Sequence, residues 1–297
     1  MLLELKTKVR RYLNKALKTQ RPTSYPYISG DSFRNLAQHI FDESMDFDPK
    51  DVSRGDIIFV RTNFLKEFSS KINPLIDNPY ILISHNEDMG VSEEMKSLAD
   101  DNKVIHWFAE NLLFEHKKIT PIPIGIDSRI GDKKNIIINS IKKYSDEKNK
   151  ITRLFYSFWV RTNFKKRIPI LEEVKKINLA DTLSEIEKET ISKEDYLKKI
   201  SKYKFIISPP GNGLDCHRTW ETIYLKSIPI VEASIPTEYW KSIGIPLMVI
   251  EKWDKLKDVT EKEFEQIFVE LSSKTACPAL RMDYWVEQIR KYKDDYC

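Results

Sequence analysis

Runs of apolar and β-branched residues alternate with amphipathic stretches along the first half of the chain. The expected strands are Ile57–Arg61, Tyr80–Ser84 and Val104–Phe108, and the expected helices are Asn63–Ile72 and Ser92–Asp100. Continuous apolar runs separated by helices indicate a parallel sheet covered on both faces. The pattern therefore predicts a Rossmann-like domain that ends near a short buried crossing segment, Pro121–Gly125.

A second alternation follows a charged stretch at Lys142–Lys150, which we interpret as the region of a domain linker. The expected strands are Thr152–Trp159, Phe205–Ser208, Ile228–Val231 and Pro246–Ile250. The expected helices are Ile136–Lys143, Lys165–Ile177, Ser192–Lys202, Asp215–Leu225, Glu261–Ser272 and Leu280–Tyr292. We expect an α/β protein with two Rossmann-like domains, 1–130 and 131–276, and a C-terminal helix within 277–297 that can cross back to the first domain.

Residues 2–19 have leucine and valine at helical spacing and six lysines and arginines at the other positions. A basic amphipathic helix of this kind can lie on an anionic membrane surface. It can equally pack its apolar stripe on the core of the first domain, and the stripe has no Trp or Phe anchor. Both interpretations are open.

Composition excludes some classes of protein. The 49 basic and 45 acidic residues nearly balance, which argues against a nucleic-acid binder but suits an anionic small ligand. Cys216, Cys277 and Cys297 are odd in number and widely spaced, which favours a reduced compartment. No apolar run is long enough to span a membrane, and no signal peptide is evident. We expect a cytoplasmic protein, with or without peripheral membrane contact.

The stretch Lys204–Ala233 has the most informative local pattern, because it combines strand, Gly/Pro loop, helix and strand. Loops at the carboxyl ends of parallel strands are where open α/β sheets bind ligands. A helix N-terminus presents unpaired backbone amides that suit phosphate. The candidate binding residues at this junction are Pro210, Gly211, Asn212, Gly213, Asp215 and His217, with Asp215 the expected N-cap.

Arg218 and Glu221 are three residues apart and therefore share one helix face. An arginine in the first turn can bind a diphosphate with two hydrogen bonds, and a glutamate one turn later can accept two ribose hydroxyls. The alternative is an internal Arg218–Glu221 ion pair beside a purely structural turn. Cys216, in the same turn, is interpreted as a packing residue.

The segment SPPGNGLDCHRTWETIYLKSIPIV resembles the donor-binding segment of exostosin-like glycosyltransferases, a GT-B family. In that pattern a Pro/Gly loop precedes an Arg-x-x-Glu pair, and a small–Ile–Pro–Ile/Val strand follows. Fainter similarities to short bacterial and viral members are Ser84-His85-Asn86 with Asp88, Trp107–Asn111 and Pro121–Gly125. The resemblance implies two domains facing each other across a cleft and an inverting transfer from a nucleotide sugar to a glycan acceptor. It also implies that Arg218 binds the donor diphosphate and Glu221 the ribose.

The resemblance assigns the acceptor side to the first domain and the nucleotide sugar to the second. An inverting transfer needs a base for the acceptor hydroxyl. Asp88, His85 and Glu87, at the end of the strand Tyr80–Ser84, are all chemically able, and Asp88 is ranked first because its position recurs in the family pattern. The other interpretation is a polar turn in which Asp88 or Asn86 caps the helix near Ser92.

Arg161, Thr162 and Asn163 follow the strand that ends at Trp159, so they are further candidates for binding the donor phosphates. A solvated basic helix face is the alternative. Asp46-Phe47-Asp48 matches the D-x-D motif of metal-dependent GT-A enzymes, but it lies in an acidic loop before the first clear strand. We therefore expect no metal and no cofactor beyond the nucleotide-sugar substrate.

Two other functions fit the same anion site. One is a phosphoribosyl-type transferase on a similar two-lobed scaffold. The other is a non-catalytic protein that binds a nucleotide or a sugar, in which the acidic loop is only a cap. The acceptor of a transferase would be a surface polysaccharide or a glycoprotein glycan.

Overall fold

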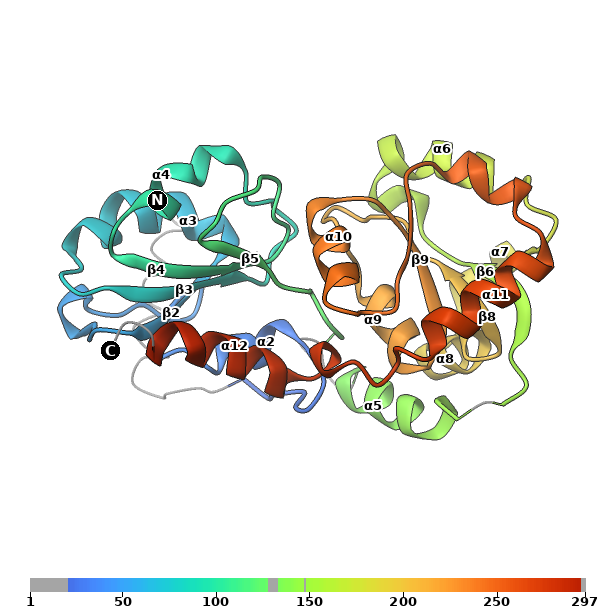
Figure 1. Ribbon diagram of the computed structural model, residues 1–297, viewed down its shortest axis with the longest axis horizontal. Coiled ribbons are helices and arrows are strands. Elements are labelled where there is room, and N and C mark those ends of the chain that lie inside the picture. Colours follow the sequence, from blue (N-terminus) through green and yellow to red (C-terminus); the bar gives the residue numbers. More distant parts are fainter. Residues whose placement is uncertain (1–20, 128–132, 147, 295–297) are drawn as a thin grey trace. The chain divides into compact units, whose positions relative to one another are not determined.

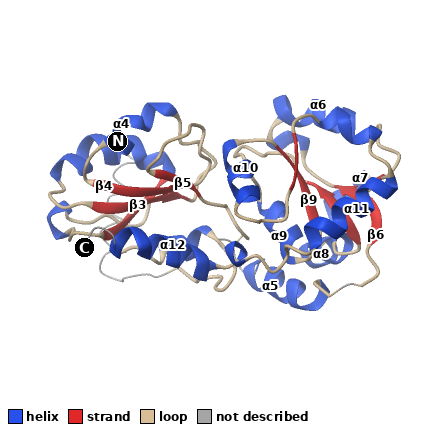
Figure 2. Cartoon of the chain, in the orientation of Figure 1, coloured by secondary structure: helices blue, strands red, loops and turns tan. Residues whose placement is uncertain are grey.

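The computed structural model describes residues 21–127, 133–146 and 148–294, and within them the chain forms two compact units. The first unit comprises Met1–Ile124 and Arg281–Cys297, and the second comprises Gly125–Leu280. Each unit contains a five-stranded sheet whose pairings are all parallel. Helices cover both faces of each sheet (Figure 2). The predicted α/β class with parallel sheets is therefore confirmed.

The sheet of the first unit has the order β1-β2-β3-β4-β5. Its strands are β1 (His39–Phe41), β2 (Asp56–Arg61), β3 (Tyr80–His85), β4 (Val104–Ala109) and β5 (Ile119–Pro121). Its helices are α2 (Gly30–Arg34), α3 (Leu65–Glu67), α4 (Lys96–Asp100) and α12 (Met282–Asp294). Every residue of β3 and β4 is buried, because helices pack on both faces of these central strands.

Helix α12 (red in Figure 1) packs on β3 although it is formed by the last part of the chain. Met282, Trp285 and Ile289 are buried along one side of it, at the spacing of a helical stripe. Trp285 contacts the ring of Phe33 from α2 at a centroid distance of 6.1 Å. The first unit is therefore built from two segments of the chain, one that precedes and one that follows the segment of the second unit.

The sheet of the second unit has the order β10-β9-β8-β6-β7. Its strands are β6 (Ile151–Tyr156), β7 (Ala180–Thr182), β8 (Tyr203–Ile207), β9 (Ile228–Glu232) and β10 (Met248–Ile250). Its helices are α5 (Lys133–Tyr144), α6 (Phe164–Val174), α7 (Glu185–Thr190), α8 (Lys193–Ile200), α9 (His217–Tyr224), α10 (Ile235–Ser242) and α11 (Glu261–Ser272).

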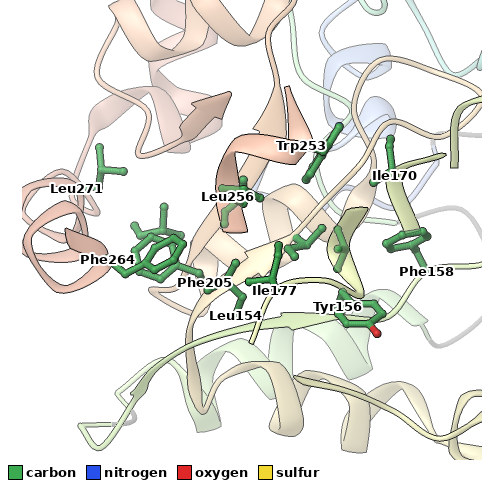
Figure 3. Packing of buried hydrophobic residues seen from close by; sticks show 14 residues of the cluster. Leu154, Tyr156, Phe158, Ile170, Ile177, Phe205, Trp253, Leu256, Phe264 and Leu271 are labelled. Atoms are coloured by element: carbon green, nitrogen blue, oxygen red, sulfur yellow. The ribbon is translucent and has the colours of Figure 1, made fainter. Parts of the chain in front are cut away.

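The core of the second unit lies between this sheet and the helices α6 and α11 (Figure 3). Phe205 of β8 meets Phe264 of α11 with ring centroids 5.1 Å apart. Phe158 and Ile170 close one end of the same cluster, so the start of α6 is anchored beside the residues that follow β6. This anchoring places α6 next to the loop that follows β8.

Some expectations fall on residues that the structure does not describe, and one differs from the structure. The helix expected at residues 2–19 and Cys297 fall outside the described part of the chain. Asp215 is not the N-cap of α9, because that position is Cys216, whose side chain makes no capping hydrogen bond. Within the described residues, no helix is long and apolar enough to cross a bilayer.

Candidate functional site

The loop Ser208–Gly213 follows β8 at its carboxyl end and is held by side chains from α6. Arg167 donates from Nε to the Pro210 carbonyl at 2.9 Å and from Nη1 to the Trp159 carbonyl at 2.8 Å. Asn163 donates from Nδ2 to the Gly211 carbonyl at 2.8 Å, while its Oδ1 caps α6 by accepting from the Lys166 amide. The loop is therefore fixed in position rather than merely connecting two elements.

Two guanidinium groups lie beside this loop. Arg167 and Arg218 are 5.6 and 5.9 Å from the centroid of the same Phe158 ring. Burial and then the charge of Arg218 hold the pKa of Arg167 below its ordinary value. Within the described residues, no carboxylate lies within ion-pair distance of either guanidinium.

Arg218 Nη1 is buried and has no hydrogen-bond partner within the described residues. Buried polar groups in proteins nearly always have a partner, so a buried cationic donor without one is expected to bind something. The nearby Arg167 cation makes an anion the favoured occupant. This arrangement is the strongest sign of a ligand site in the second unit.

The amino end of α9 adds backbone donors to the same place. Cys216 provides no side-chain cap, and the Asp215 carboxylate accepts instead from Trp220 Nε1 at 2.7 Å. The amide groups of the first turn are therefore not capped by the side chain that precedes them. Ser208 Oγ and Thr219 Oγ1 share a hydrogen bond of 2.9 Å, which ties the first turn of α9 to the end of β8.

His217, the first residue of α9, is engaged through Nδ1. Nδ1 donates to the Gly125 carbonyl at 2.7 Å, because a carbonyl can only accept. Nε2 is then the ring nitrogen left for a further hydrogen bond. Gly125 has a φ of 68°, in the region that favours glycine.

Glu221 is 1% exposed and forms an ion pair with Lys193 of α8, at 2.7 Å from Oε1 and 2.8 Å from Oε2. The expected alternative, an Arg218–Glu221 ion pair, is therefore absent from these described residues. Tyr196 lies near both Arg218 and Glu221, and the Lys193 ammonium is 5.4 Å from the centroid of its ring. Burial raises the pKa of Tyr196 to about 12, so its hydroxyl stays protonated.

Arg161 and Thr162 are exposed at the edge of this region. The Arg161 guanidinium lies 4.4 Å from the centroid of the Trp159 ring. A Cβ on Gly211 would lie 4.0 Å from Thr162 Cγ2 and 3.4 Å from Arg167 Nη2. Of these three residues, Asn163 hydrogen-bonds to the loop that precedes α9 and Thr162 lies beside Gly211 of that loop, whereas Arg161 contacts Trp159.

In the first unit, His85 ends β3 and is fully buried. Its Nε2 donates to the Pro123 carbonyl at 3.0 Å, and its Nδ1 lies 3.1 Å from Glu110 Oε2. Glu87 forms an ion pair with Arg61 at 2.8 Å, whereas the side chain of Asp88 is exposed. Of the three candidate bases, Asp88 is the most accessible to an acceptor hydroxyl. The N-cap position of the next helical turn is Ser92, and not Asp88 or Asn86. The Ser92 side chain makes no capping hydrogen bond there.

The first unit also contains a network of charged side chains that was not predicted from the sequence. It joins the ends of β1, β2 and β3 through the residues Arg21, Asp31, Arg34, Asp42, Glu43 and Arg61. The buried pair at its centre is Arg34–Asp42, with 2.8 Å between Nε and Oδ2. The available signal was that Asp42 and Glu43 directly follow a short apolar run, but that run was too short to be recognised as a strand.

No group of His, Cys, Asp and Glu that could hold a metal ion is present in the described residues. Asp48, the second acid of the D-x-D motif, accepts from the Lys50 amide at 3.0 Å and caps the short helix Pro49–Asp51. Its carboxylate therefore has a local structural role.

Comparison with known proteins gives structural likenesses only. No family model and no curated protein matches the chain. A UDP-forming α,α-trehalose-phosphate synthase from Burkholderia vietnamiensis aligns with 10% identity and a TM-score of 0.42, covering 81% of this chain and 75% of its own. An α,α-trehalose 6-phosphate synthase from Burkholderia multivorans aligns with 8% identity and a TM-score of 0.45, covering 81% and 71%.

Proposed function

We propose that the protein is a GT-B glycosyltransferase that transfers a sugar from a nucleotide-sugar donor to a glycan acceptor, with inversion and without a metal. The observation that carries the proposal is the buried Arg218 Nη1 without a partner, beside Arg167 and the amino end of α9. Two cations and uncapped backbone amides suit the two phosphates of a nucleoside diphosphate. The resemblance of the segment around Arg218 to exostosin-like glycosyltransferases points to the same class of ligand.

In the proposed reaction the acceptor hydroxyl oxygen attacks the anomeric carbon of the donor sugar. The bond from that carbon to the diphosphate breaks, and its electron pair leaves with the nucleoside diphosphate. Arg218 and Arg167 stabilise the negative charge that develops there, which is the work a metal would otherwise do. The hydroxyl proton goes to a carboxylate of the first unit, for which Asp88 is the first candidate.

The role proposed for Glu221 requires a change of partner. Its carboxylate can accept ribose hydroxyls only when Lys193 moves aside or shares it, because both oxygens lie within 2.8 Å of the ammonium. The 31% exposure of Lys193 leaves room for such a movement. Binding of the ribose at this position is part of the proposal.

The test measures binding of UDP and GDP, and transfer from nucleotide sugars, in Arg218→Ala and Arg218→Lys. Losing charge-assisted bonds worth about 1.5–3 kcal/mol should weaken nucleotide binding by about 10–100-fold in the alanine variant. The lysine variant should recover part of the affinity. Arg153→Ala, which removes a surface pair with Asp181, is the matched control and should bind as wild type. Equal affinity in Arg218→Ala would contradict the site.

Adding EDTA tests the proposed independence from metal. Transfer should continue at an unchanged rate when the chelator is in excess. A strict requirement for added Mn²⁺ or Mg²⁺ would reject this part of the proposal and direct attention to Asp46 and Asp48.

The second candidate is a protein that binds a nucleotide or a sugar without turnover. The buried His85, with both ring nitrogens engaged, and the ion-paired Glu87 favour it, because only Asp88 is then accessible as a base. Nucleotide binding without donor hydrolysis or transfer would support this candidate. A phosphoribosyl-type transferase would instead respond to a ribose 5-phosphate 1-diphosphate donor.

A further inference from the structure

The second unit exposes a cluster of large apolar side chains at the start of α6. Trp159, Phe164 and Ile168 are 39%, 60% and 49% exposed. Phe164 and Ile168 are four residues apart, so they lie one above the other on one side of the helix. Together with the exposed cations Arg161, Lys165 and Lys166 they form what we call the aromatic–basic patch.

Helix α6 has one buried side and one exposed side, which carries Phe164 and Ile168 of the patch. The other side is fixed in the unit, because Arg167, Ile170 and Val174 are buried there. Phe158 and Ile170 belong to the core cluster seen in Figure 3. Phe164 and Ile168 are therefore not core residues that have failed to pack, and their helix is rigidly held in place.

The charge of the patch has one sign. Residues 157–170, SFWVRTNFKKRIPI, contain four cations and no acidic residue. Just after the end of the same helix, Lys175 and Lys176 are each paired with a glutamate three residues before them. Within the described residues, no such ion pair engages Lys165 or Lys166, so their charges are available to a partner.

We propose that the aromatic–basic patch is a docking surface for an anionic lipid bilayer. Membrane-interface segments combine tryptophan and phenylalanine with flanking lysine and arginine. The aromatic rings enter the headgroup region, and the cations bind anionic lipids. Three apolar side chains are too few to insert deeply, so the contact is peripheral and depends on lipid charge. The inference does not rest on the proposed transferase activity.

Charge complementarity decides for lipid over a protein partner. A protein interface of ordinary size concentrates aromatic and arginine side chains in a dry centre, with mixed polar groups at its rim. The patch instead has three exposed cationic side chains and no acid over fourteen consecutive residues. A bilayer rich in phosphatidylglycerol is the surface that matches this pattern.

The experiment measures sedimentation of the full-length protein with vesicles of phosphatidylcholine alone and of phosphatidylcholine with 30% phosphatidylglycerol. Phe164→Gln/Ile168→Gln and Lys165→Glu/Lys166→Glu are compared with wild type at low and at 0.5 M salt. Wild type should bind only the anionic vesicles, and salt should release it. The charge variant should bind at least about 25-fold more weakly, since each cation near the surface contributes about fivefold and two are reversed. The apolar variant should also bind more weakly, because it loses the two side chains that enter the headgroup region.

Matched controls separate this surface from others. Ile186→Gln/Val269→Gln removes two side chains that are 77% and 63% exposed elsewhere in the second unit, and it should bind like wild type. Lys175→Glu/Lys176→Glu reverses the paired lysines that follow the end of α6 and should weaken vesicle binding less than Lys165→Glu/Lys166→Glu does. All variants should unfold at the wild-type temperature, because the altered side chains are exposed.

Three results would overturn the proposal. One is vesicle binding by the patch variants that equals wild type, as expected if residues 2–19 alone contact the membrane. Another is wild-type protein that does not bind anionic vesicles. The third is a self-association or a protein complex that the patch variants abolish while vesicle binding stays unchanged.

Discussion

His106 shows how burial sets the charge of one side chain in the first unit. Its ring stacks on Tyr292 at a centroid distance of 3.6 Å, and Nε2 shares a hydrogen bond of 2.8 Å with Thr120 Oγ1. Burial, with the nearby charges of Lys118 and His116, lowers the pKa of His106 to about 3. The histidine is therefore neutral in the folded protein at any ordinary pH.

This depressed pKa makes stability depend on pH in one direction. The unfolded chain takes up a proton at His106 near pH 6.5, whereas the folded protein does so only near pH 3. The contribution to stability is complete above pH 6.5 and is lost as the pH falls from 6.5 towards 3. We expect wild type to lose about 2 kcal/mol of unfolding free energy at pH 5 from this residue.

Urea unfolding at pH 7.5 and pH 5 checks the effect. His106→Gln, which keeps a donor near Thr120, should have a smaller loss between the two pH values than wild type. His116→Gln, which removes one of the two nearby charges that lower the pKa of His106, should reduce the loss by a smaller amount than His106→Gln does. Identical pH dependence in His106→Gln and wild type would refute the assignment.

Two glycines differ in how closely other atoms approach them. A Cβ on Gly30 would lie 2.6 and 2.8 Å from two atoms of the buried His85 ring and would also overlap the Asn86 side chain. A Cβ on Gly211 would meet Arg167 Nη2 at 3.4 Å, which is ordinary contact. No side chain larger than that of glycine fits at position 30, whereas a methyl group fits at position 211 beside the candidate anion site.

The matched pair Gly30→Ala and Gly211→Ala tests this difference. Gly30→Ala should destabilise the protein by about 1–3 kcal/mol, because the ring or the backbone must shift. Gly211→Ala should change stability by less than about 0.5 kcal/mol and weaken nucleotide binding, because its methyl group narrows the space beside Arg167. Thermal unfolding and nucleotide titration of both variants provide the two measurements, and a destabilised Gly211→Ala would contradict the prediction.

At the scale of elements, the Lys193–Glu221 pair joins α8 to α9. The carboxylate is buried, and the ammonium is its only ion-pair partner within the described residues. Removing the lysine leaves the buried Glu221 carboxylate without a compensating charge, and an uncompensated buried charge destabilises the folded protein. The pair therefore fixes how the helix that carries Arg218 sits on its neighbour.

We expect Lys193→Met to destabilise the protein by about 1–3 kcal/mol, a value reduced for the partial exposure of the lysine. The double variant Lys193→Met/Glu221→Gln should be more stable than the sum of the two single changes, because no uncompensated charge remains. Lys175→Met, which removes an exposed pair with Glu172, is the control and should have almost no effect. Additive single changes in urea unfolding would show that the pair carries no coupling.

The longer elements were predictable from sequence, and the short ones were not. β2, β3, β4 and α11 lie within one residue of the expected ranges, because each has a clear apolar run or helical period. β1 and β7 have three residues each, and α2 has five, which is too short for either periodicity to show. The expected strand Thr152–Trp159 ends earlier, at Tyr156, because Phe158 turns into the core beside α6.

Local sequence also predicted half of the candidate site. The loop, Arg218 and Arg161–Asn163 were found because they are close in sequence to a strand end or a helix start. The ion pair of Glu221 was missed because Lys193 comes from another helix, 28 residues away. The His85–Glu110 contact was missed for the same reason, since only the sheet brings the ends of β3 and β4 together.

At the scale of the whole molecule, the two units differ in how the chain contributes to them. The second is one continuous segment, Gly125–Leu280, whereas the first needs both Met1–Ile124 and Arg281–Cys297. Tyr27 and Arg281 pair as an isolated antiparallel bridge, and the Met282 amide donates to the Pro26 carbonyl at 3.0 Å. These contacts and the buried Trp285 make α12 part of the first core.

Separate fragments should therefore behave differently. Residues 125–280 should unfold cooperatively on heating, because their core cluster is made within the segment. Residues 1–124 should not, unless residues 281–297 are attached through a flexible linker. Circular dichroism of the three polypeptides measures this, and cooperative unfolding of 1–124 alone would contradict it.

The position of α12 also has a consequence for biosynthesis. A ribosome makes the helix that closes the first unit only after the whole of the second unit, so residues 21–124 emerge early and remain without α12 until the end of that synthesis. During that interval the surface of β3 that α12 later covers is open, and it is apolar. The first unit is thus the later of the two to reach its native state, because its core stays incomplete until α12 has been made.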